Sequence, residues 1–184
     1  MKECDFRGLL VSCECGFERD TASEAWWVLS SLLEHKIIDA DLTEVRGLVF
    51  IKVDTDPRQI MGDLREFLVK NLDEIRYCLK FIPIQDWCKT DLNLICKKVA
   101  ENSNEISEAD RWRIVLNKRY NSLKRKDIVN QVAMQISHGK VDLNNPNKIV
   151  RIEIVGKNTG ISIHQPDQII SIEKLRRNRG NAYL

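Results

Sequence analysis

The residues with the clearest chemical potential form a basic stretch from Arg111 to Lys126. Its sixteen positions hold seven cations and no acidic side chain. These cations are Arg111, Arg113, Lys118, Arg119, Lys124, Arg125 and Lys126. The last three occupy the first turn of a predicted helix, where the helix dipole favours negative charge. Stability alone would place Asp or Glu there, so the pattern favours a phosphate held between these side chains and the free N–H groups of the helix start.

The alternative for this stretch is a solvated run of charge, which is the usual fate of such runs. Lys118 and Arg119 end the predicted strand before the helix, so they are placed to face the same point as the helix start. Because the cations at 124–126 oppose the helix dipole, we favour phosphate binding over a solvated face.

Two polar loops offer neutral donors and acceptors to sugars or base edges. Asn145 lies in the first loop, at 140–148, and Asn158 lies in the second, a predicted five-residue turn from Gly156 to Gly160. Asn and Gly are also ordinary turn residues, so turn formation alone is the alternative for both loops.

The sequence offers little support for catalysis. It contains no G-x-G-x-x-G, no P-loop, no G-x-S-x-G and no H-x-E…C-x-x-C motif. Its three histidines, His35, His138 and His164, are scattered along the chain. We therefore predict a protein without an active site and without a cofactor.

The six cysteines raise the question of a metal. Cys13 and Cys15 lie close to Cys4 in sequence, but zinc sites usually combine C-x₂₋₄-C spacing with a second pair, and neither is present. Cys13 ends a predicted strand, where packing in the core is the simpler role. We predict no metal site and keep a cysteine-based metal or redox protein as the rival class, which metal analysis of the purified protein would test.

Composition and charge restrict the class of protein. The 184 residues suit one large domain or two small ones, no apolar run approaches the roughly 18 residues of a membrane span, and the N-terminus lacks the apolar segment of a signal peptide. We expect a cytoplasmic protein that binds no membrane. Residues 1–90 hold 12 Lys and Arg against 17 Asp and Glu, whereas from Arg111 onward the counts are 15 against 5. This asymmetry indicates a basic half that meets an anion, and nucleic acid is the first candidate.

The elements that must position these residues fall into two units. Apolar runs in the first unit predict four strands, at 6–12, 37–42, 46–53 and 76–84. A capping box at Thr21–Glu24 starts the first helix, and Asp56 followed by Pro57 starts the second. The succession β-α-β-β-α-β is ferredoxin-like and is assigned to residues 1–88.

The first helix of this unit carries two tryptophans, Trp26 and Trp27, soon after its predicted start. Base stacking is one use for such exposed rings. We expect both to pack in the core or in an interface instead.

The second unit is predicted to begin with a helix capped by Thr90. A strand with one basic face follows, because Trp112, Ile114 and Leu116 alternate with polar and basic residues. Ser122 is the predicted cap of the next helix, which Gly139 ends.

Alternating apolar residues then predict a β-hairpin on either side of the turn at 156–160, and a short last strand at 168–172. The succession of the second unit is α-β-α-β-β-β over residues 89–174. Residues 175–184 are read as a basic, frayed tail. The fold class is therefore α+β.

The second unit resembles the THUMP domain, an RNA-binding module of tRNA-modifying proteins. The matching segments, in order, are KRYNS, VDLNNPNKIV, RIEIVG and GISI. An N-terminal ferredoxin-like unit is the usual companion of THUMP domains, and LLVSC, VRGLVFIKV and RYCLKFIPI resemble that companion. As a whole, the chain is similar to the stand-alone THUMP proteins that assist tRNA cytidine N4-acetylation.

This resemblance implies a function and a set of contacts. THUMP domains grip the single-stranded 3′ end and the acceptor stem of tRNA, usually for a catalytic domain fused further along the chain. Here the chain ends at Leu184, which implies an adaptor rather than an enzyme. The implied RNA-binding positions are Lys118, Arg119, the helix start from Ser122 to Lys126, and Lys157 with Asn158 in the hairpin turn.

We therefore expect a non-catalytic protein that binds the acceptor stem and 3′ CCA end of tRNA and presents the tRNA to a separate acetyltransferase. The alternative is a THUMP subunit for another tRNA-modifying enzyme, one that carries out methylation or thiolation. The sequence does not identify that enzyme, the modified nucleotide or the oligomeric state.

Overall fold

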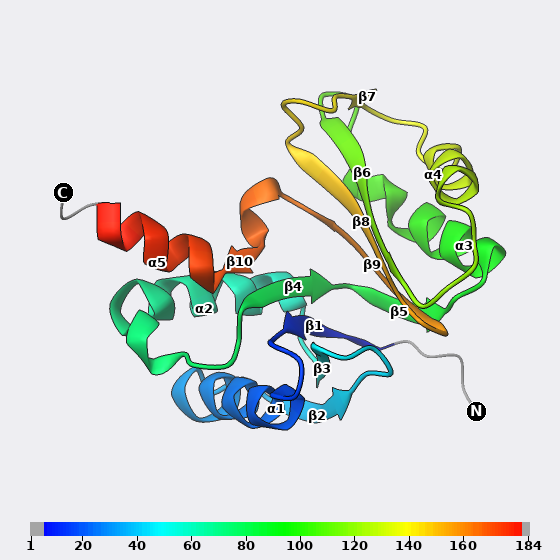
Figure 1. Ribbon diagram of the computed structural model, residues 1–184. Helices are drawn as coiled ribbons and strands as arrows, with labels where there is room; N and C mark the ends of the chain where they lie inside the picture. Colours follow the sequence, from blue (N-terminus) through cyan, green and yellow to red (C-terminus); the bar gives the residue numbers. More distant parts are fainter. Residues whose placement is uncertain (1–5, 182–184) are drawn as a thin grey trace. The chain divides into compact units, whose positions relative to one another are not determined.

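The structure, a computed structural model, describes residues 6–181 and divides them into two compact units (Figure 1). The first unit combines Arg7–Pro83 with the segment that begins at Asp167, and the second is Ile84–Pro166. The chain therefore leaves the first unit, builds the second and returns.

The first unit is a five-stranded sheet in the order β10-β4-β1-β3-β2 with helices packed on it. Its elements are β1 (Arg7–Ser12), α1 (Glu18–Trp27), the π-helical turn η1 (Val28–Leu32), β2 (Ile37–Leu42), β3 (Leu48–Val53), α2 (Pro57–Asn71), the 3₁₀ turn η2 (Leu72–Glu74), β4 (Lys80–Ile84), β10 (Ile170–Ser171) and α5 (Ile172–Asn181). Up to β4 the predicted succession of strands and helices is present. The start of α2 is as predicted, because Asp56 accepts a hydrogen bond from the Arg58 N–H at 2.9 Å and Pro57 is the first helical residue.

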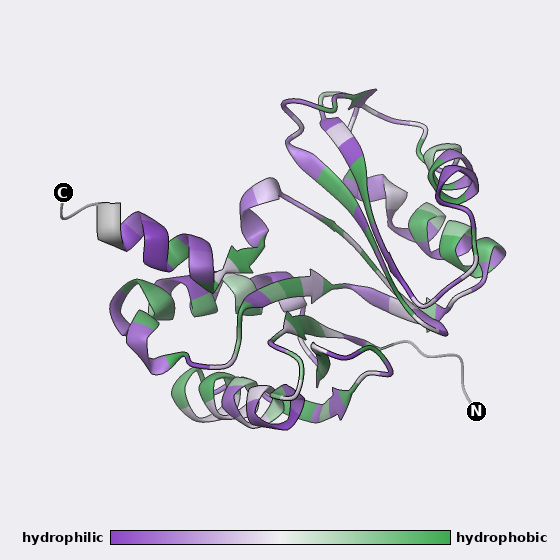
Figure 2. Ribbon diagram, in the orientation of Figure 1, coloured by the Kyte–Doolittle hydropathy of each residue, from purple (hydrophilic) through white to green (hydrophobic). Residues whose placement is uncertain are grey.

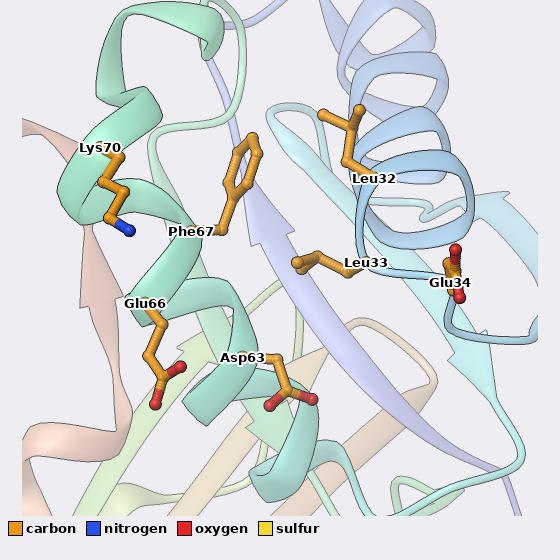
Figure 3. A pocket seen from close by; sticks show the side chains of 7 residues that line it. All are labelled: Leu32, Leu33, Glu34, Asp63, Glu66, Phe67 and Lys70. Carbon is orange, nitrogen blue, oxygen red and sulfur yellow. The ribbon is translucent and has the colours of Figure 1, made fainter.

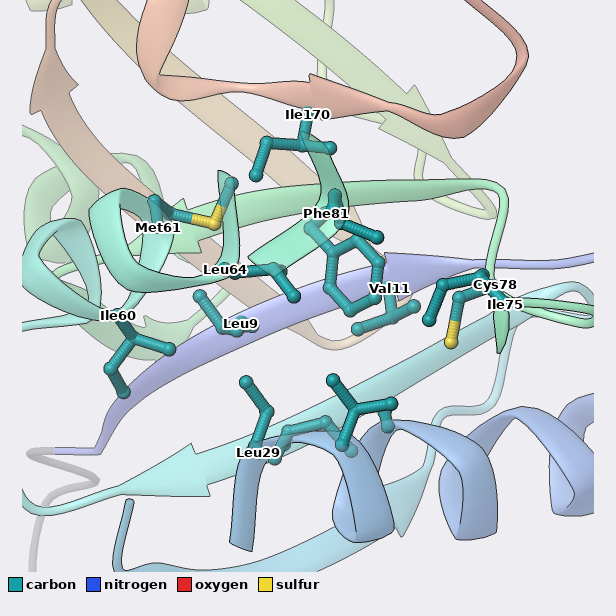
Figure 4. Close-up of a cluster of buried hydrophobic side chains, with 14 of the residues drawn as sticks. Leu9, Val11, Leu29, Ile60, Met61, Leu64, Ile75, Cys78, Phe81 and Ile170 are labelled. Carbon is teal, nitrogen blue, oxygen red and sulfur yellow. The ribbon is translucent and has the colours of Figure 1, made fainter. Parts of the chain in front are cut away.

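The core of the first unit lies between this sheet and the two helices (Figure 4). Leu9 and Val11 of β1 contribute to it from one face of the strand, since side chains two residues apart share a face. Leu29 in η1 and Ile60 and Leu64 in α2 pack with them, and all five side chains are fully buried. This packing fixes both helices on the same side of the sheet.

Helix α1 begins one turn earlier than the capping box at Thr21–Glu24 predicts. The carboxylate of its first residue, Glu18, accepts hydrogen bonds from the N–H groups of Gly16 at 2.9 Å and Gly47 at 2.8 Å. Thr21 lies inside the helix and is fully buried. The predicted cap is wrong because a contact with a residue 29 positions away helps to fix the first turn.

Glu24 has a different role from the predicted one. Its carboxylate accepts three backbone hydrogen bonds, from Arg76 at 2.6 Å, Tyr77 at 3.0 Å and Cys78 at 2.7 Å. These N–H groups are therefore not available to a neighbouring strand. As a result, β4 begins at Lys80 rather than at residue 76 as predicted.

The tryptophans of α1 are not in the core. Trp26 and Trp27 are 41% and 44% exposed, whereas Val28 and Leu29, which follow them, are fully buried. The expectation of core packing is therefore wrong for both rings. The expectation of packing in an interface stays a prediction.

The C-terminal segment through Asn181 belongs to the first unit. Ile170 of β10 pairs with Phe81 of β4, and the predominantly hydrophilic helix α5 follows (Figure 2). Arg176 donates to the Ile75 carbonyl, and Arg179 lies 2.9 Å from Asp73. Of the predicted frayed tail at 175–184, residues 175–181 are helical, and 182–184 lie outside the described residues. The second unit ends at Pro166 rather than at residue 174.

The second unit is a five-stranded sheet in the order β5-β9-β8-β6-β7 with two helices on one face. Its elements are β5 (Asp86–Lys89), α3 (Leu92–Asn102), the 3₁₀ turn η3 (Ser103–Glu105), β6 (Arg111–Arg119), α4 (Arg125–Ala133), β7 (Lys140–Val141), β8 (Lys148–Val155) and β9 (Asn158–His164). Strands β6 and β8 are parallel, whereas β8 and β9 form an antiparallel hairpin. The predicted α-β-α-β-β-β succession lacked the two short edge strands, β5 and β7, and assigned β10 to this unit.

Packing against α3 and α4 explains why one face of this sheet is apolar. Trp112 and Leu116 of β6 and Ile152 of β8 lie in one buried cluster with Ile95 of α3 and Ile128 of α4. The alternation predicted for β6 is therefore correct for the face that carries Trp112 and Leu116. Within residues 6–181, no helix is both long and apolar enough to cross a membrane.

The hairpin turn is shorter than predicted. Val155 pairs directly with Asn158, so the turn contains only Gly156 and Lys157 rather than five residues. Gly156 has φ +61°, a conformation that favours glycine at the first central position of a two-residue turn. Gly160 lies within β9, opposite Trp87 of β5.

Helix α3 is capped by Asp91 and not by Thr90 as predicted. The Asp91 carboxylate accepts from the N–H groups of Asn93 at 2.9 Å and Leu94 at 3.0 Å. The Thr90 hydroxyl instead lies 2.9 Å from the hydroxyl of Thr159 in β9. Thr90 thereby joins the start of the helix to the sheet.

We expect Glu24→Gln to lower the free energy of unfolding of the first unit by about 1–3 kcal/mol, because one acceptor oxygen and the charge are lost while three N–H groups remain. Urea denaturation followed by circular dichroism measures this effect. Asp20→Asn, at an exposed position of the same helix, is the matched control and should change stability by less than about 0.5 kcal/mol. Equal midpoints for the two variants would contradict the bridging role of Glu24.

Gly160→Ala should destabilise the second unit, because its Cβ would lie 2.6 Å from Cζ3 of Trp87 and 2.9 Å from Cδ1 of Ile84. The expected loss is about 1–3 kcal/mol, typical of an overpacked core. Gly62→Ala in α2 is the control, since a Cβ there has open space and alanine favours helix by about 0.5–1 kcal/mol. A denaturation midpoint for Gly160→Ala equal to or above that of the wild type would show that β9 does not need glycine at residue 160.

Candidate nucleic-acid interface

The structure divides the predicted binding residues between the two ends of β6. This strand has nine residues, so its ends lie roughly 26 Å apart at about 3.3 Å per residue. The β7-side cluster, at the start of the strand, consists of Arg111, Arg113 and Asn145. The α4-side cluster, at the end of the strand, consists of Lys118, Arg119, Ser122, Lys124, Arg125, Lys126, Lys157 and Asn158. The single basic stretch of the sequence is therefore not a single site.

The β7-side cluster holds a loop in place. Arg111 lies 3.6 Å from the carboxylate of Asp142, and Arg113 donates to the Leu143 carbonyl at 2.9 Å. The Asn145 backbone N–H donates to Asp142 at 2.9 Å. Backbone hydrogen bonds from Asn145 and Asn144, with the nearby charge of Arg111, lower the pKa of Asp142 below its ordinary value. These contacts give the residues a structural role and neutralise part of the positive charge.

The α4-side cluster is joined to the hairpin turn by backbone contacts. The Gly156 N–H donates to the Arg119 carbonyl at 2.9 Å, and the side chain of Asn121 donates to the Gly156 carbonyl at 3.2 Å. Exposed Lys157 and half-buried Asn158 therefore lie beside the end of β6. The structure thus brings the hairpin turn next to Arg119.

Lys118 braces the loop between β6 and α4. Its ammonium group donates to the carbonyls of Asn121 at 2.9 Å and Leu123 at 2.8 Å. Asn121 also accepts from the Leu123 N–H at 2.9 Å. These bonds shape residues 120–124 before any ligand binds, so Lys118 serves the fold as well as the charge of this surface.

Helix α4 begins at Arg125, and its N-cap is Lys124 rather than Ser122 as predicted. The ammonium group of Lys124 cannot accept a hydrogen bond, and no side chain within residues 6–181 caps this helix start. Arg125 turns back and donates to the Leu116 carbonyl at 2.7 Å, whereas Lys124 and Lys126 are exposed. The uncapped N–H groups and two exposed ammonium groups thus occupy the same end of α4, an arrangement that suits an anion.

A buried polar network lies next to this end of the sheet. Glu153 of β8 is fully buried. Its carboxylate accepts hydrogen bonds from the side chains of Asn117 at 2.7 Å, Arg119 at 3.1 Å and Arg151 at 2.8 Å. Arg151 also donates to Nε2 of His164 at 3.1 Å, so that nitrogen accepts, and Nδ1 donates to the Gln165 carbonyl at 2.6 Å. Glu153, which Arg151 also holds, thereby fixes the direction of the Arg119 side chain.

The sequence did not indicate two features of this region. The Glu153 network joins residues 34 and 36 positions apart, and nothing local in the sequence marks such pairs. Tyr120, between Arg119 and Asn121, is 72% exposed and has φ +53°. Its presence in the KRYNS segment was visible, but its backbone conformation was not.

A hollow in the first unit has the wrong charge for RNA (Figure 3). It has a volume of about 500 Å³, and an apolar floor formed by Leu32, Leu33 and Phe67. Its polar lining consists of Glu34, Asp63, Glu66 and Lys70. Three carboxylates against one ammonium group would repel a phosphate backbone, so the nucleic-acid interface is sought in the second unit.

Cysteines and histidines form no metal centre in the part of the chain that the structure describes. Within residues 6–181, no three His, Cys, Asp or Glu side chains lie close enough together to hold a metal ion. Cys13 is buried at the end of β1, as core packing predicts, and burial raises the pKa of its thiol. Cys4, the third member of the candidate metal site, lies outside the described residues.

Comparison with known proteins gives the second unit a family. The THUMP domain family matches residues 89–164. Among curated protein sequences, none matches this chain. The matched range runs from the end of β5 to the end of β9 and contains both clusters.

Solved structures with a similar fold include the following three. PH1313 from Pyrococcus horikoshii OT3 is 14% identical with a TM-score of 0.64, over 86% of this chain and 55% of its own. TrmN from Thermus thermophilus is 14% identical with a TM-score of 0.54, over 85% and 45%. A 4-thiouridine synthetase in complex with RNA and ATP is 16% identical with a TM-score of 0.56, over 90% and 42%.

The chain spans about half the length of these three proteins, and identities this low establish likeness of fold alone. The family match is specific to the segment that carries the candidate interface. Residues 89–164 of this chain are therefore a THUMP domain.

Proposed function

We propose that the THUMP domain of this chain binds tRNA at its acceptor stem and 3′ CCA end through the α4-side cluster. The observation that carries the proposal is the uncapped start of α4, where Lys124 replaces a capping residue and Lys126 adds a second exposed cation. A helix start favours carboxylates, and Asp127 supplies one in this turn, whereas the lysines at 124 and 126 oppose the helix dipole and suit an anionic ligand. A nucleic-acid phosphate supplies that anion.

The geometry supports a phosphate held by one helix end and two lysines. The N–H groups of the first turn of α4 would donate hydrogen bonds to a phosphate oxygen, while Lys124 and Lys126 supply charge from the same turn. Lys157 and Asn158 lie at the neighbouring hairpin turn, joined to the end of β6 by the contact between Gly156 and Arg119. They would meet the next phosphate or its sugar.

The comparisons support RNA as the source of the phosphate. THUMP domains are RNA-binding modules, and one of the similar structures is a 4-thiouridine synthetase bound to RNA. The β7-side cluster, roughly 26 Å away along β6, would contact a second part of the same RNA. Because Arg111 and Arg113 already bind the loop at 142–143, we assign them the smaller share of the affinity.

The finer proposal is an adaptor role in tRNA cytidine N4-acetylation, in which this protein presents the tRNA to a separate acetyltransferase. It is supported by the order of the segments LLVSC, VRGLVFIKV, RYCLKFIPI and KRYNS, which resembles that of the adaptor family. It is also supported by a ferredoxin-like arrangement of the first unit, whose strands lie in the order β4-β1-β3-β2. Service to a methyltransferase or a thiolation enzyme is the alternative, and the 4-thiouridine synthetase illustrates the second.

Binding of tRNA by the purified protein across a salt series tests the proposal. If four to six phosphates are engaged, log K should fall with log salt at a slope of roughly −3 to −5. The double variant Lys124→Ala/Lys126→Ala should bind more weakly and reduce the magnitude of the slope by about 1.5, because two phosphate contacts are lost. Removal of the 3′ CCA should weaken binding by the wild-type protein.

The matched control is Lys70→Ala/Lys97→Ala. It removes the same charge from exposed positions on α2 and α3, outside both clusters. Its slope should stay close to that of the wild type. Equal losses in the two double variants would mean that only net charge matters, and the α4-side cluster would then not be a site.

A further inference from the structure

An exposed aromatic ring stands in the middle of the α4-side cluster. Tyr120 follows the last residue of β6 and is 72% exposed. Arg119 precedes it, and Lys118 braces the loop that follows it. A large ring left in water gains little from burial, so packing does not explain a tyrosine at this position.

The backbone of Tyr120 makes the choice of residue more unusual. Its φ of +53° lies in the left-handed region, which glycine and asparagine adopt readily and bulky residues rarely adopt. Stability alone would favour glycine or asparagine at this turn. The strained backbone therefore carries a ring that the fold itself does not use, and such residues cluster at binding sites.

The loop holds the backbone of Tyr120 in place. Asn121, the next residue, donates to the Gly156 carbonyl at 3.2 Å, and Lys118 donates to the Asn121 carbonyl at 2.9 Å. The Arg119 side chain before it is bonded to buried Glu153 at 3.1 Å. Both neighbours of Tyr120 are thus tied to other parts of the domain, so the backbone that carries the ring loses little freedom when a ligand binds.

An exposed ring among cations matches one class of ligand. Single-stranded nucleic acid is bound by a positive groove that follows the backbone, together with aromatic rings on which the bases stack. A paired base has both faces covered by its neighbours, whereas an unpaired base offers a free face.

We propose that Tyr120 stacks on an unpaired base of RNA bound at the α4-side cluster. This inference rests on the proposed function and adds the contact that distinguishes single-stranded from paired RNA. The cations bind phosphates of any sequence, and the ring selects the segment whose bases are free. A tRNA acceptor end, with a paired stem that continues into unpaired nucleotides, presents both features.

The test uses the full chain and an RNA minihelix that ends in an unpaired 3′ extension, with 2-aminopurine placed at one unpaired position at a time. Stacking quenches 2-aminopurine fluorescence, so wild-type protein and Tyr120→Phe should quench at least one position. Tyr120→Leu should not, and it should bind roughly 5- to 100-fold more weakly. The salt slope of Tyr120→Leu should equal that of the wild type, because a ring releases no counterions.

Two further variants separate stacking from folding. Tyr120→Gly removes the ring and relieves the left-handed backbone, so it should melt at or above the wild-type temperature and still lose affinity to the same extent. Val141→Ala truncates an exposed apolar side chain on β7, at the far end of β6, and should bind RNA as the wild type does.

The outcomes distinguish this inference from the proposed function. Wild-type affinity and quenching in Tyr120→Leu, with weakened binding in Lys124→Ala/Lys126→Ala, would overturn the stacking contact and leave the phosphate site standing. Absence of any salt-dependent binding by the wild-type protein would overturn both. A lower melting temperature in every Tyr120 variant that loses affinity, Tyr120→Gly included, would assign the residue a structural role instead.

Discussion

The arrangement of the candidate interface depends on the parallel pairing of β6 with β8 and on the carboxylate of Glu153 between them. The register places Asn117 opposite Glu153, and Glu153 then binds Asn117 and Arg119 on one strand and Arg151 on its own. A buried carboxylate needs such partners, and the arginines in turn need the carboxylate. The network therefore fixes the position of the end of β6, and the residues of the α4-side cluster lie around that strand end.

From this fixed strand end, a short loop leads into a helix whose start lacks a side-chain cap. Lys118 and Asn121 shape the loop, so that the first turn of α4 and the hairpin turn at Gly156 are held near the same strand end. Lys118, itself exposed, and Arg119 are bonded within the fold, whereas Lys124 and Lys126 are exposed at the helix start. One basic stretch thus holds cations that stabilise the loop and cations to which we assign the phosphate.

Local signals in the sequence predicted the local structure well. The Asp56–Pro57 start of α2, the paired strands β1 and β3 and the buried face of β6 all follow from residues adjacent in the chain. Contacts between distant residues account for the errors. Glu24 accepts hydrogen bonds from residues 52 to 54 positions away, so β4 begins later than predicted. Strand β10 pairs in the sheet of the first unit rather than extending the sheet of the second. The short edge strands β5 and β7 have too few residues to show a period.

The candidate site was predicted as a charge pattern but not as a geometry. The dipole argument singled out the start of α4, where the N-cap is Lys124 rather than Ser122 and makes no side-chain cap hydrogen bond. The sequence could not show that Arg111 and Arg113 lie apart from the other cations. Their distance from the α4-side cluster depends on the length of β6, and Asp142 neutralises part of their positive charge. Nor could it reveal the left-handed conformation of Tyr120.

Amide hydrogen exchange, with and without a tRNA acceptor minihelix, tests the central claim most directly. The N–H groups at 124–127 lie at the helix start to which the phosphate is assigned, and those at 156–158 lie at the neighbouring turn. We expect slower exchange in both segments on addition of the RNA, and little change in α1, α2 and α5. Slower exchange confined to 140–147 or to the first unit, with 124–127 unchanged, would contradict the assignment of the interface.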